Sequence, residues 1–299
     1  PVEVMRVLRK ASKHCYLLES ASQTEVWGRF SFLGYEPAME ITCTDGVLNI
    51  RKTGEDMVVT KKVEHPGDTL REIIEQYKTP VMEELPPFTG GLVGYFSYDY
   101  IKYSEQKLKL EDKEQQDFRD MDLMLFDQVI AFDHYRQKVL LIAGVMTDDL
   151  EASYQKAEGK LEEMAQLLKT GPHMEFEKLK LESDIRPQFP EAEYCKMVEK
   201  AKHYIREGDI FQVVLSNPMR AKATGNLFDT YRVLRATNPS PYMFYFSSDD
   251  IEIAGASPET LVKLEAGNLS TFPLAGTRPR GKTREEDREL EAGLLKDEK

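Results

Sequence analysis

The chain has 299 residues, 41% of them hydrophobic and 10% aromatic, which is enough for two ordinary domains with sizeable cores. Its net charge of −12 argues against non-specific binding to nucleic acid, and no apolar run approaches the length of a membrane span. The three cysteines, Cys15, Cys43 and Cys195, are scattered without metal-ligand spacing. This pattern argues against structural zinc and favours a cytoplasmic location.

The first third of the chain predicts an antiparallel meander rather than alternating strands and helices. A helical period occupies Val2–Ala11, and Asp45-Gly46 is typical of a two-residue hairpin turn. Strands are predicted over residues 15–19, 26–33, 39–44, 47–51 and 57–61.

The middle of the chain continues with mixed signals. Asp68 is predicted to cap a helix whose apolar face runs from Leu70 to Tyr77. Residues 90–98 carry three glycines among aromatic side chains, which is typical of a strand in close contact with neighbouring backbone. An exposed charged excursion (102–120), a strand pair (123–132 and 138–145) and a long helix (150–168) follow.

Residues 173–189 are polar and lack a clear period, so they are predicted to link a domain of residues 1–172 to one of residues 190–299. In the second domain, Pro190 opens a helix that Gly208 closes. A strand over 210–215, a helix over 228–235 and a second meander over 242–247, 251–254, 260–264 and 269–274 follow. Composition and period together predict an α+β fold with antiparallel sheets.

Residues 271–281, TFPLAGTRPRG, combine small residues, a hydroxyl group and cations. Pro273 is typical of an edge strand, and Gly276 allows backbone to approach a ligand closely. Four cations lie within seven residues, which suits a carboxylate-bearing ligand: Arg278, Arg280, Lys282 and Arg284. A solvated basic loop has the same pattern, so the residues alone leave both interpretations open.

Eight motifs in family order resemble the chorismate-utilising enzymes, and within that family the component I chains of anthranilate synthases. They are LLES (17–20), WGRFSFLG (27–34), FTGGLVGYFSYD (88–99), FDH (132–134), GDIFQVVLS (208–216), NPSPYMFYF (238–246), GASPE (255–259) and PLAGTRPRG (273–281). The resemblance implies packed antiparallel sheets flanked by helices, with an N-terminal domain intertwined with a chorismate-binding domain.

The resemblance also implies a substrate site. Gly276 and Thr277 take the place of family residues that contact chorismate, and Ala275 and Gln212 are the informative neighbours. Aminodeoxychorismate synthases carry a nucleophilic lysine where Ala275 stands, and isochorismate synthases a basic lysine where Gln212 stands. Neither an alanine nor an amide performs that chemistry. Direct addition of ammonia to chorismate, the anthranilate synthase reaction, is therefore expected.

A regulatory pocket is implied as well. LLES and NPSPYM resemble the two halves of the tryptophan feedback site of this family, which assigns Leu18, Glu19, Ser20, Pro241, Tyr242 and Met243. Tyr242 and Met243 offer backbone carbonyls to an ammonium group and apolar surface to an indole. Glu19 has two open roles, pairing with that ammonium or orienting a neighbouring cation. A ligand that bridges segments from both predicted domains would change their orientation.

The remaining expectations concern the complete enzyme. The chain starts without methionine and ends within an amphipathic run, so we expect it to be an N-terminal piece of a longer protein. The Mg²⁺ ligands and acid/base groups of the family are expected beyond Lys299, so no catalytic or metal residue is assigned here and the chain alone is expected to be inactive. Ammonia would come from a glutamine amidotransferase subunit. The alternatives are an aminodeoxychorismate or isochorismate synthase, or a non-catalytic tryptophan-binding module.

Overall fold

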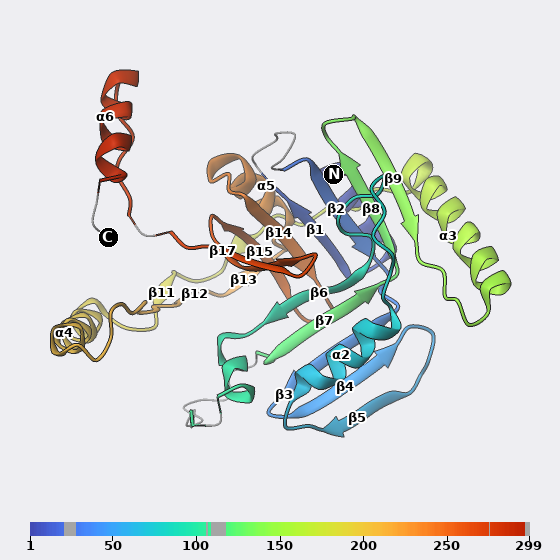
Figure 1. The fold of residues 1–299 in the computed structure, drawn as a ribbon, viewed down its shortest axis with the longest axis horizontal. Helices are drawn as coiled ribbons and strands as arrows, with labels where there is room; N and C mark the ends of the chain where they lie inside the picture. Colours follow the sequence, from blue (N-terminus) through green and yellow to red (C-terminus); the bar gives the residue numbers. More distant parts are fainter. Residues whose placement is uncertain (21–27, 106, 109–117, 275, 297–299) are drawn as a thin grey trace.

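A computed structural model describes residues 1–20, 28–105, 107–108, 118–274 and 276–296. Two antiparallel sheets form its centre, with helices packed on their outer faces (Figure 1). One sheet has six strands in the order β15-β14-β1-β2-β8-β9, and the other has five in the order β5-β4-β3-β7-β6. The predicted α+β class with packed antiparallel sheets is confirmed. None of the described helices is long and apolar enough to cross a membrane.

The elements have the following bounds. The six-stranded sheet contains β1 (Cys15–Glu19), β2 (Phe30–Tyr35), β8 (Gln128–Asp133), β9 (Lys138–Ala143), β14 (Tyr242–Ser247) and β15 (Glu252–Ser257). The five-stranded sheet contains β3 (Met39–Thr44), β4 (Val47–Lys52), β5 (Val58–Lys62), β6 (Gly91–Phe96) and β7 (Met121–Phe126). The helices are α1 (Val2–Ala11), α2 (Pro66–Gln76), the 3₁₀ helix η1 (Tyr98–Tyr103), α3 (Leu150–Thr170), α4 (Glu191–Glu207), α5 (Phe228–Thr237) and α6 (Arg284–Leu294).

Short strands complete the list. Two two-stranded ladders follow α3, formed by β10 (Lys180–Leu181) with β13 (Ala223–Thr224) and by β11 (Arg186–Pro187) with β12 (Met219–Arg220). A separate hairpin consists of β16 (Thr260–Glu265) and β17 (Asn268–Phe272).

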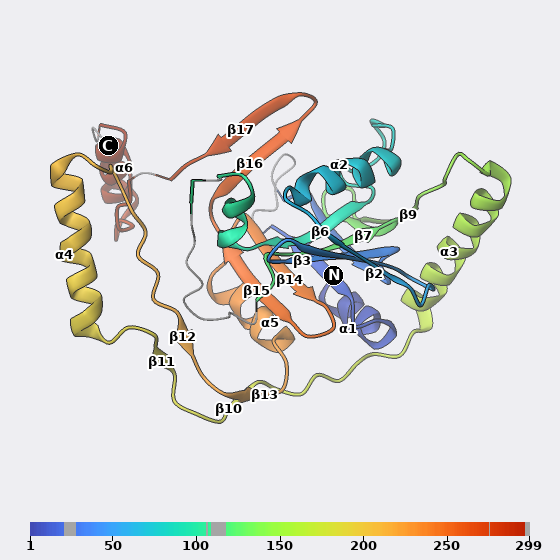
Figure 2. The same cartoon turned by 90° about the horizontal axis from the view of Figure 1, so that it is seen from below.

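Strand β1 shows how side-chain alternation builds the layers. Successive side chains of a strand point to opposite faces of a sheet. Cys15 and Leu17 pack with α1 and α5, while Tyr16 packs with the β7 side chains of the five-stranded sheet. Figure 2 shows α1 and α5 on one side of the paired sheets and α2 on the opposite side. The hydrophobic cores therefore lie between α1, α5 and the first sheet, between the two sheets, and under α2.

Several local predictions are confirmed. Helix α1 and strands β1, β3 and β14 have the predicted bounds. Asp45 and Gly46 have φ angles of 48° and 75°, as the predicted hairpin turn requires. A side chain at Gly94 would collide with the Asp122 carbonyl oxygen of β7, so this glycine does permit close backbone contact.

Other local predictions are wrong. The single strand predicted over 123–132 is two strands, β7 and β8, which separate at Asp127 and join different sheets. Asp68 does not cap α2: the helix begins at Pro66, so Asp68 lies in its first turn and pairs with Arg71. The predicted exposed excursion over 102–120 is wrong at its two ends, because Lys102 and Tyr103 are half-buried and Asp120 is buried and accepts a hydrogen bond from Tyr103 at 2.7 Å. The described residues 104, 105, 107, 108 and 118 are exposed, as predicted.

The later part of the chain differs most from prediction. Strands β14 and β15 form no separate meander, because β14 pairs with β1 and extends the six-stranded sheet. Residues 210–215 form no strand; Phe211 is 100% exposed, and no described strand lies beside this segment to pair with its backbone. Helix α4 ends at Gly208 as predicted, but its apolar face contains no buried residue. The division into domains stays a prediction.

Candidate functional site

The pairing of β1 with β14 brings together the two segments predicted to bind an effector. In the register of these strands, Glu19 lies opposite Met243 and Leu18 lies opposite Phe244. Opposite residues of an antiparallel pair share one face of the sheet. Glu19 and Met243 therefore both face α5, and Met243 is fully buried there.

Glu19 is a buried carboxylate with both oxygens engaged. Its Oε2 accepts a 2.7 Å hydrogen bond from the Tyr231 hydroxyl, and Arg235 approaches Oε2 at 2.9 Å and Oε1 at 3.1 Å. Burial, reinforced by the Glu19 charge, raises the pKa of Tyr231, so this hydroxyl remains a donor. Of the two roles open for Glu19, this geometry favours orienting a cation, Arg235.

The other predicted effector residues lie around the same sheet end. Ser20 is half-buried and directly follows β1, while Pro241 is exposed and precedes β14. Tyr242 is 38% exposed, and its hydroxyl is hydrogen-bonded to that of Thr260. Leu18 packs between the two sheets, on the face opposite Glu19. The predicted residues thus occupy both faces of one sheet end.

Sequence reasoning missed two residues on α5 that complete this arrangement. Tyr231 and Arg235 are four residues apart, so they lie on the same helix face, and both reach Glu19. Their spacing just before the NPSPYM turn was the available signal. Nearby, the Ser31 hydroxyl lies 2.6 Å from His134 Nε2, and burial lowers the pKa of this histidine.

The predicted substrate residues are not assembled into a pocket. Gln212, Gly276 and Thr277 are all exposed and outside regular elements, and Ala275 lies outside the described residues. A side chain at Gly276 would stand 2.9 Å from Leu294 Cδ1, so the close approach at this glycine is to α6. Within the described ranges, no hydrogen bond joins Gln212 to Gly276 or Thr277. Their assignment to chorismate stays a prediction.

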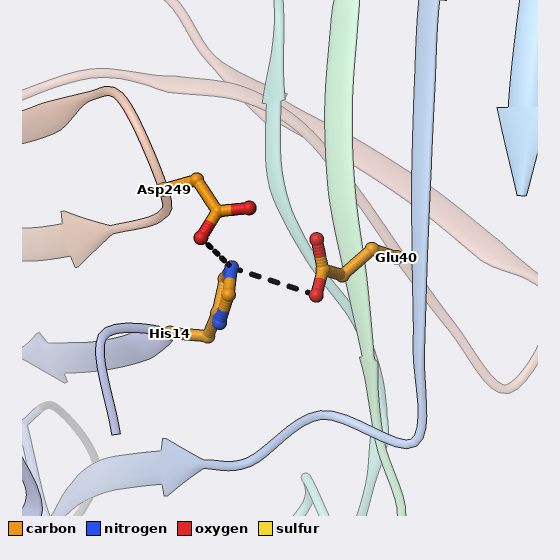
Figure 3. A group of neighbouring side chains, drawn as sticks. All are labelled: His14, Glu40 and Asp249. Atoms are coloured by element: carbon orange, nitrogen blue, oxygen red, sulfur yellow. Dashed lines mark ion pairs between the residues drawn. The ribbon is translucent and has the colours of Figure 1, made fainter. Parts of the chain in front are cut away.

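A third group of polar side chains was not predicted. His14 Nε2 lies 3.4 Å from Glu40 Oε1 and 3.4 Å from Asp249 Oδ1 (Figure 3). The second oxygens of both carboxylates bind Arg51, at 2.6 Å from Glu40 Oε2 and 2.8 Å from Asp249 Oδ2. The three carboxylate and imidazole groups are close enough together to be considered as metal ligands.

Comparison with known proteins identifies the family. The sequence profile of the chorismate-binding enzymes matches residues 13–299. The chain therefore belongs to the chorismate-binding enzyme family.

Individual relatives of the chain include enzymes with two different names. Anthranilate synthase component 1 of Aquifex aeolicus is 37% identical over 310 residues, covering 100% of this chain and 61% of the relative. Aminodeoxychorismate synthase component 1 of Bacillus subtilis is also 37% identical, covering 98% of this chain and 60% of the relative. The crystal structure of anthranilate synthase component I from Streptococcus pneumoniae TIGR4 is 36% identical with a TM-score of 0.73, covering 91% of this chain and 57% of that one. The chain thus spans about three-fifths of the length of these relatives.

Proposed function

We propose that the protein containing this chain is an anthranilate synthase component I, which converts chorismate and ammonia to anthranilate, pyruvate and water in tryptophan biosynthesis. Overall similarity does not distinguish this activity from aminodeoxychorismate synthesis, because a relative of each kind is 37% identical. The observation that carries the proposal is the residue type at two positions. Gln212 and Ala275 stand where the resemblance places the lysines of isochorismate and aminodeoxychorismate synthases.

The proposed chemistry follows from those side chains. An amide has no useful basicity near neutral pH, and a methyl group has no nucleophilic electron pair. The chain therefore supplies neither activation of water by residue 212 nor covalent capture of the ring by residue 275. Ammonia adds directly to the ring, the ring hydroxyl leaves as water, and elimination of pyruvate then gives the aromatic product. A glutamine amidotransferase subunit is the proposed ammonia source.

Mg²⁺, which the family resemblance implies, does not fit the described side chains. His14, Glu40 and Asp249 form the candidate ligand group. Mg²⁺ prefers octahedral oxygen ligands, whereas this group includes an imidazole nitrogen and its carboxylates already bind Arg51. We therefore derive no step through a metal at this group and propose that residues outside this chain supply the Mg²⁺ ligands.

Feedback inhibition by tryptophan is the second part of the proposal. The β1–β14 register supports it, because Glu19 and Met243 lie opposite one another. Since both Glu19 oxygens bind Tyr231 and Arg235, the ligand ammonium is expected to bind backbone carbonyls of residues 241–243, where β14 begins, instead.

The activity is tested with the complete polypeptide that contains this chain. Chorismate, Mg²⁺ and an ammonium salt are supplied, and products are separated by chromatography. Anthranilate and pyruvate are expected in equal amounts, and omission of ammonium is expected to abolish both. Formation of isochorismate or 4-amino-4-deoxychorismate without anthranilate would contradict the proposal.

The effector site is tested on the same enzyme with Ser20→Ala and, as a matched control, Ser270→Ala in β17. Loss of one hydrogen bond is expected to raise the tryptophan concentration for half-inhibition about 5- to 10-fold for Ser20→Ala only. Equal inhibition of both variants and the parent enzyme would remove Ser20 from the site.

A further inference from the structure

The turn that joins β14 to β15 is fastened to the other sheet by two arginines. Asp249 binds Arg51 of β4 at 2.8 Å, and the same arginine binds Glu40 of β3 at 2.6 Å. We call these three residues the Arg51 clasp. The turn therefore shares this guanidinium with the five-stranded sheet.

The neighbouring turn residue makes an equivalent contact. Asp250 binds Arg119 at 2.8 Å, and Arg119 also binds Asp122 of β7 at 2.5 Å. These three residues form the Arg119 clasp. Each clasp sets two carboxylates against one guanidinium, so each carries an excess negative charge when both acids are ionised.

The two clasps differ in how that excess is met. In the Arg51 clasp, His14 Nε2 lies 3.4 Å from Glu40 Oε1 and 3.4 Å from Asp249 Oδ1, the oxygens opposite those that bind Arg51 (Figure 3). This nitrogen is buried and makes no hydrogen bond. No histidine approaches the described acids of the Arg119 clasp within ion-pair distance, and there burial raises the pKa of Asp122.

The charged groups around His14 come from four segments. They are Glu40 on β3, Arg51 on β4, Asp249 on the β14–β15 turn, and the adjacent Lys13, whose charge acts on Asp249. The hydrogen bond from Arg51 holds the pKa of Asp249 low, with His14 and Lys13 contributing. Asp249 therefore stays ionised across the range in which a histidine changes charge.

We propose that His14 is a proton-operated switch for the Arg51 clasp. When Nε2 takes a proton from solvent, it donates to a free oxygen of Glu40 or Asp249 and compensates the excess negative charge. The β14–β15 turn is then held more tightly to β3 and β4. Loss of the proton leaves two carboxylates on one arginine and loosens the turn. Strand β14 carries this turn at one end and begins at Tyr242, directly after Pro241, at the other.

A divalent cation is a less suitable occupant of the same space. Arg51 keeps its positive charge within 2.8 Å of both carboxylates, so a metal would have to approach a guanidinium as well as its ligands. A proton on His14 adds one positive charge and leaves both contacts of Arg51 in place.

The test compares melting temperatures at about pH 5.5 and about pH 8, across the titration range of histidine. The matched variants are Asp249→Asn and Asp250→Asn, whose side chains are 49% and 62% exposed, so both are expected to fold. Asp249→Asn is expected to lower the melting temperature by about 2 °C more at the lower pH than at the higher. Asp250→Asn is expected to lower it equally at both.

The same comparison is repeated in a His14→Gln background, where the pH dependence of the Asp249→Asn effect is expected to disappear. An equal Asp249→Asn effect at both pH values, or a pH dependence that survives His14→Gln, would overturn the proposal. So would a rise in melting temperature at about pH 8 when Zn²⁺ is added to the parent protein but not to His14→Gln, because that result would make the group a metal site.

Discussion

Two regions of the molecule have similar apolar patterns but pack very differently. One is the six-stranded sheet with its helices, and the other contains α4, residues 210–215 and the β16–β17 hairpin. Helix α1 buries Met5, Val7 and Leu8, whereas the longer helix α4 buries no residue. Phe228 is fully buried, and Phe211 is 100% exposed. An apolar pattern determines which face of a helix or strand can be buried, but that face is buried only where a partner surface packs against it.

The difference in packing between the two regions is visible in the ribbon views. Helices α4 and α6 project away from the paired sheets on extended segments, whereas α1 and α5 lie directly on a sheet (Figures 1 and 2). The β16–β17 hairpin is similarly bare, with Leu261 at 90% and Leu269 at 73% exposure. Within the described residues, neither α4 nor α6 has a side chain buried against a partner surface of the kind that covers α1 and α5.

The largest expected effect on stability comes from comparing the buried Phe228 with the exposed Phe211. The Phe228 ring lies 4.6 Å from the tilted ring of Phe176 and 5.1 Å from the ring of Tyr245, which it meets edge to face, measured between ring centroids. Phe228→Ala leaves a cavity and is expected to lower the free energy of unfolding by about 3–5 kcal/mol. Phe211→Ala removes a ring exposed to solvent and is expected to change it by less than about 0.5 kcal/mol. Urea denaturation of both variants measures the difference; equal losses would mean that Phe211 is packed in solution.

Two glycines, one in the paired sheets and one in α6, compare close backbone packing with open space. Any side chain at Gly94 meets the Asp122 carbonyl oxygen, whereas nothing lies within 4 Å of a side chain at Gly293 of α6. Gly94→Ala is therefore expected to cost about 1–3 kcal/mol because β6 must move away from β7. Gly293→Ala is expected to leave global stability within about 0.5 kcal/mol. Thermal melts test both; an unaffected Gly94→Ala protein would contradict the close β6–β7 contact.

The smallest expected effect compares two ion pairs. Hydrogen bonds from Arg29 hold the pKa of Asp133 down to about 2. A lowered pKa means that the carboxylate stabilises the fold above its unfolded pKa near 4 and loses this contribution as pH falls towards 2. Asp133→Asn is expected to cost about 1–2 kcal/mol at neutral pH, and the difference from the parent is expected to shrink below about pH 4.

The matched control is Asp287→Asn on α6. Asp287 pairs with Arg280, whose side chain is 90% exposed, so the change is expected to be small at every pH. Denaturant unfolding at several pH values measures both variants. A loss for Asp133→Asn that does not shrink in acid would show that the carboxylate acts through shape rather than charge.

Local signals explain which parts of the fold were predictable. Val2–Ala11 and Cys15–Glu19 match to the residue because helical period and strand composition are properties of a few neighbouring side chains. The break at Asp127 was missed because β7 is buried along its whole length and β8 at every residue except Phe132, so the apolar run gave no sign of the break. The strand predicted over 210–215 failed because its pairing depends on a distant partner.

The candidate site shows the same limit. The resemblance indicated that LLES and NPSPYM belong together, but it left two roles for Glu19. The choice between them depends on Arg235, which is 216 residues away in sequence. The group formed by His14, Glu40 and Asp249 was missed for the same reason, because the residues around each of them in the sequence do not indicate that the other two lie nearby.

The pairing of β1 with β14 has a consequence for how the protein is made. The partners of β1 include a strand whose last residue is Ser247, so a nascent chain cannot complete the pairing of β1 until that residue has left the ribosome. At typical elongation rates of about 5–20 residues per second, the apolar side chains of β1 wait on the order of 10–50 seconds for their neighbour. During that interval the emerging polypeptide presents β1 with β2 on one side and an open edge on the other, the state in which chaperone binding or aggregation competes with folding.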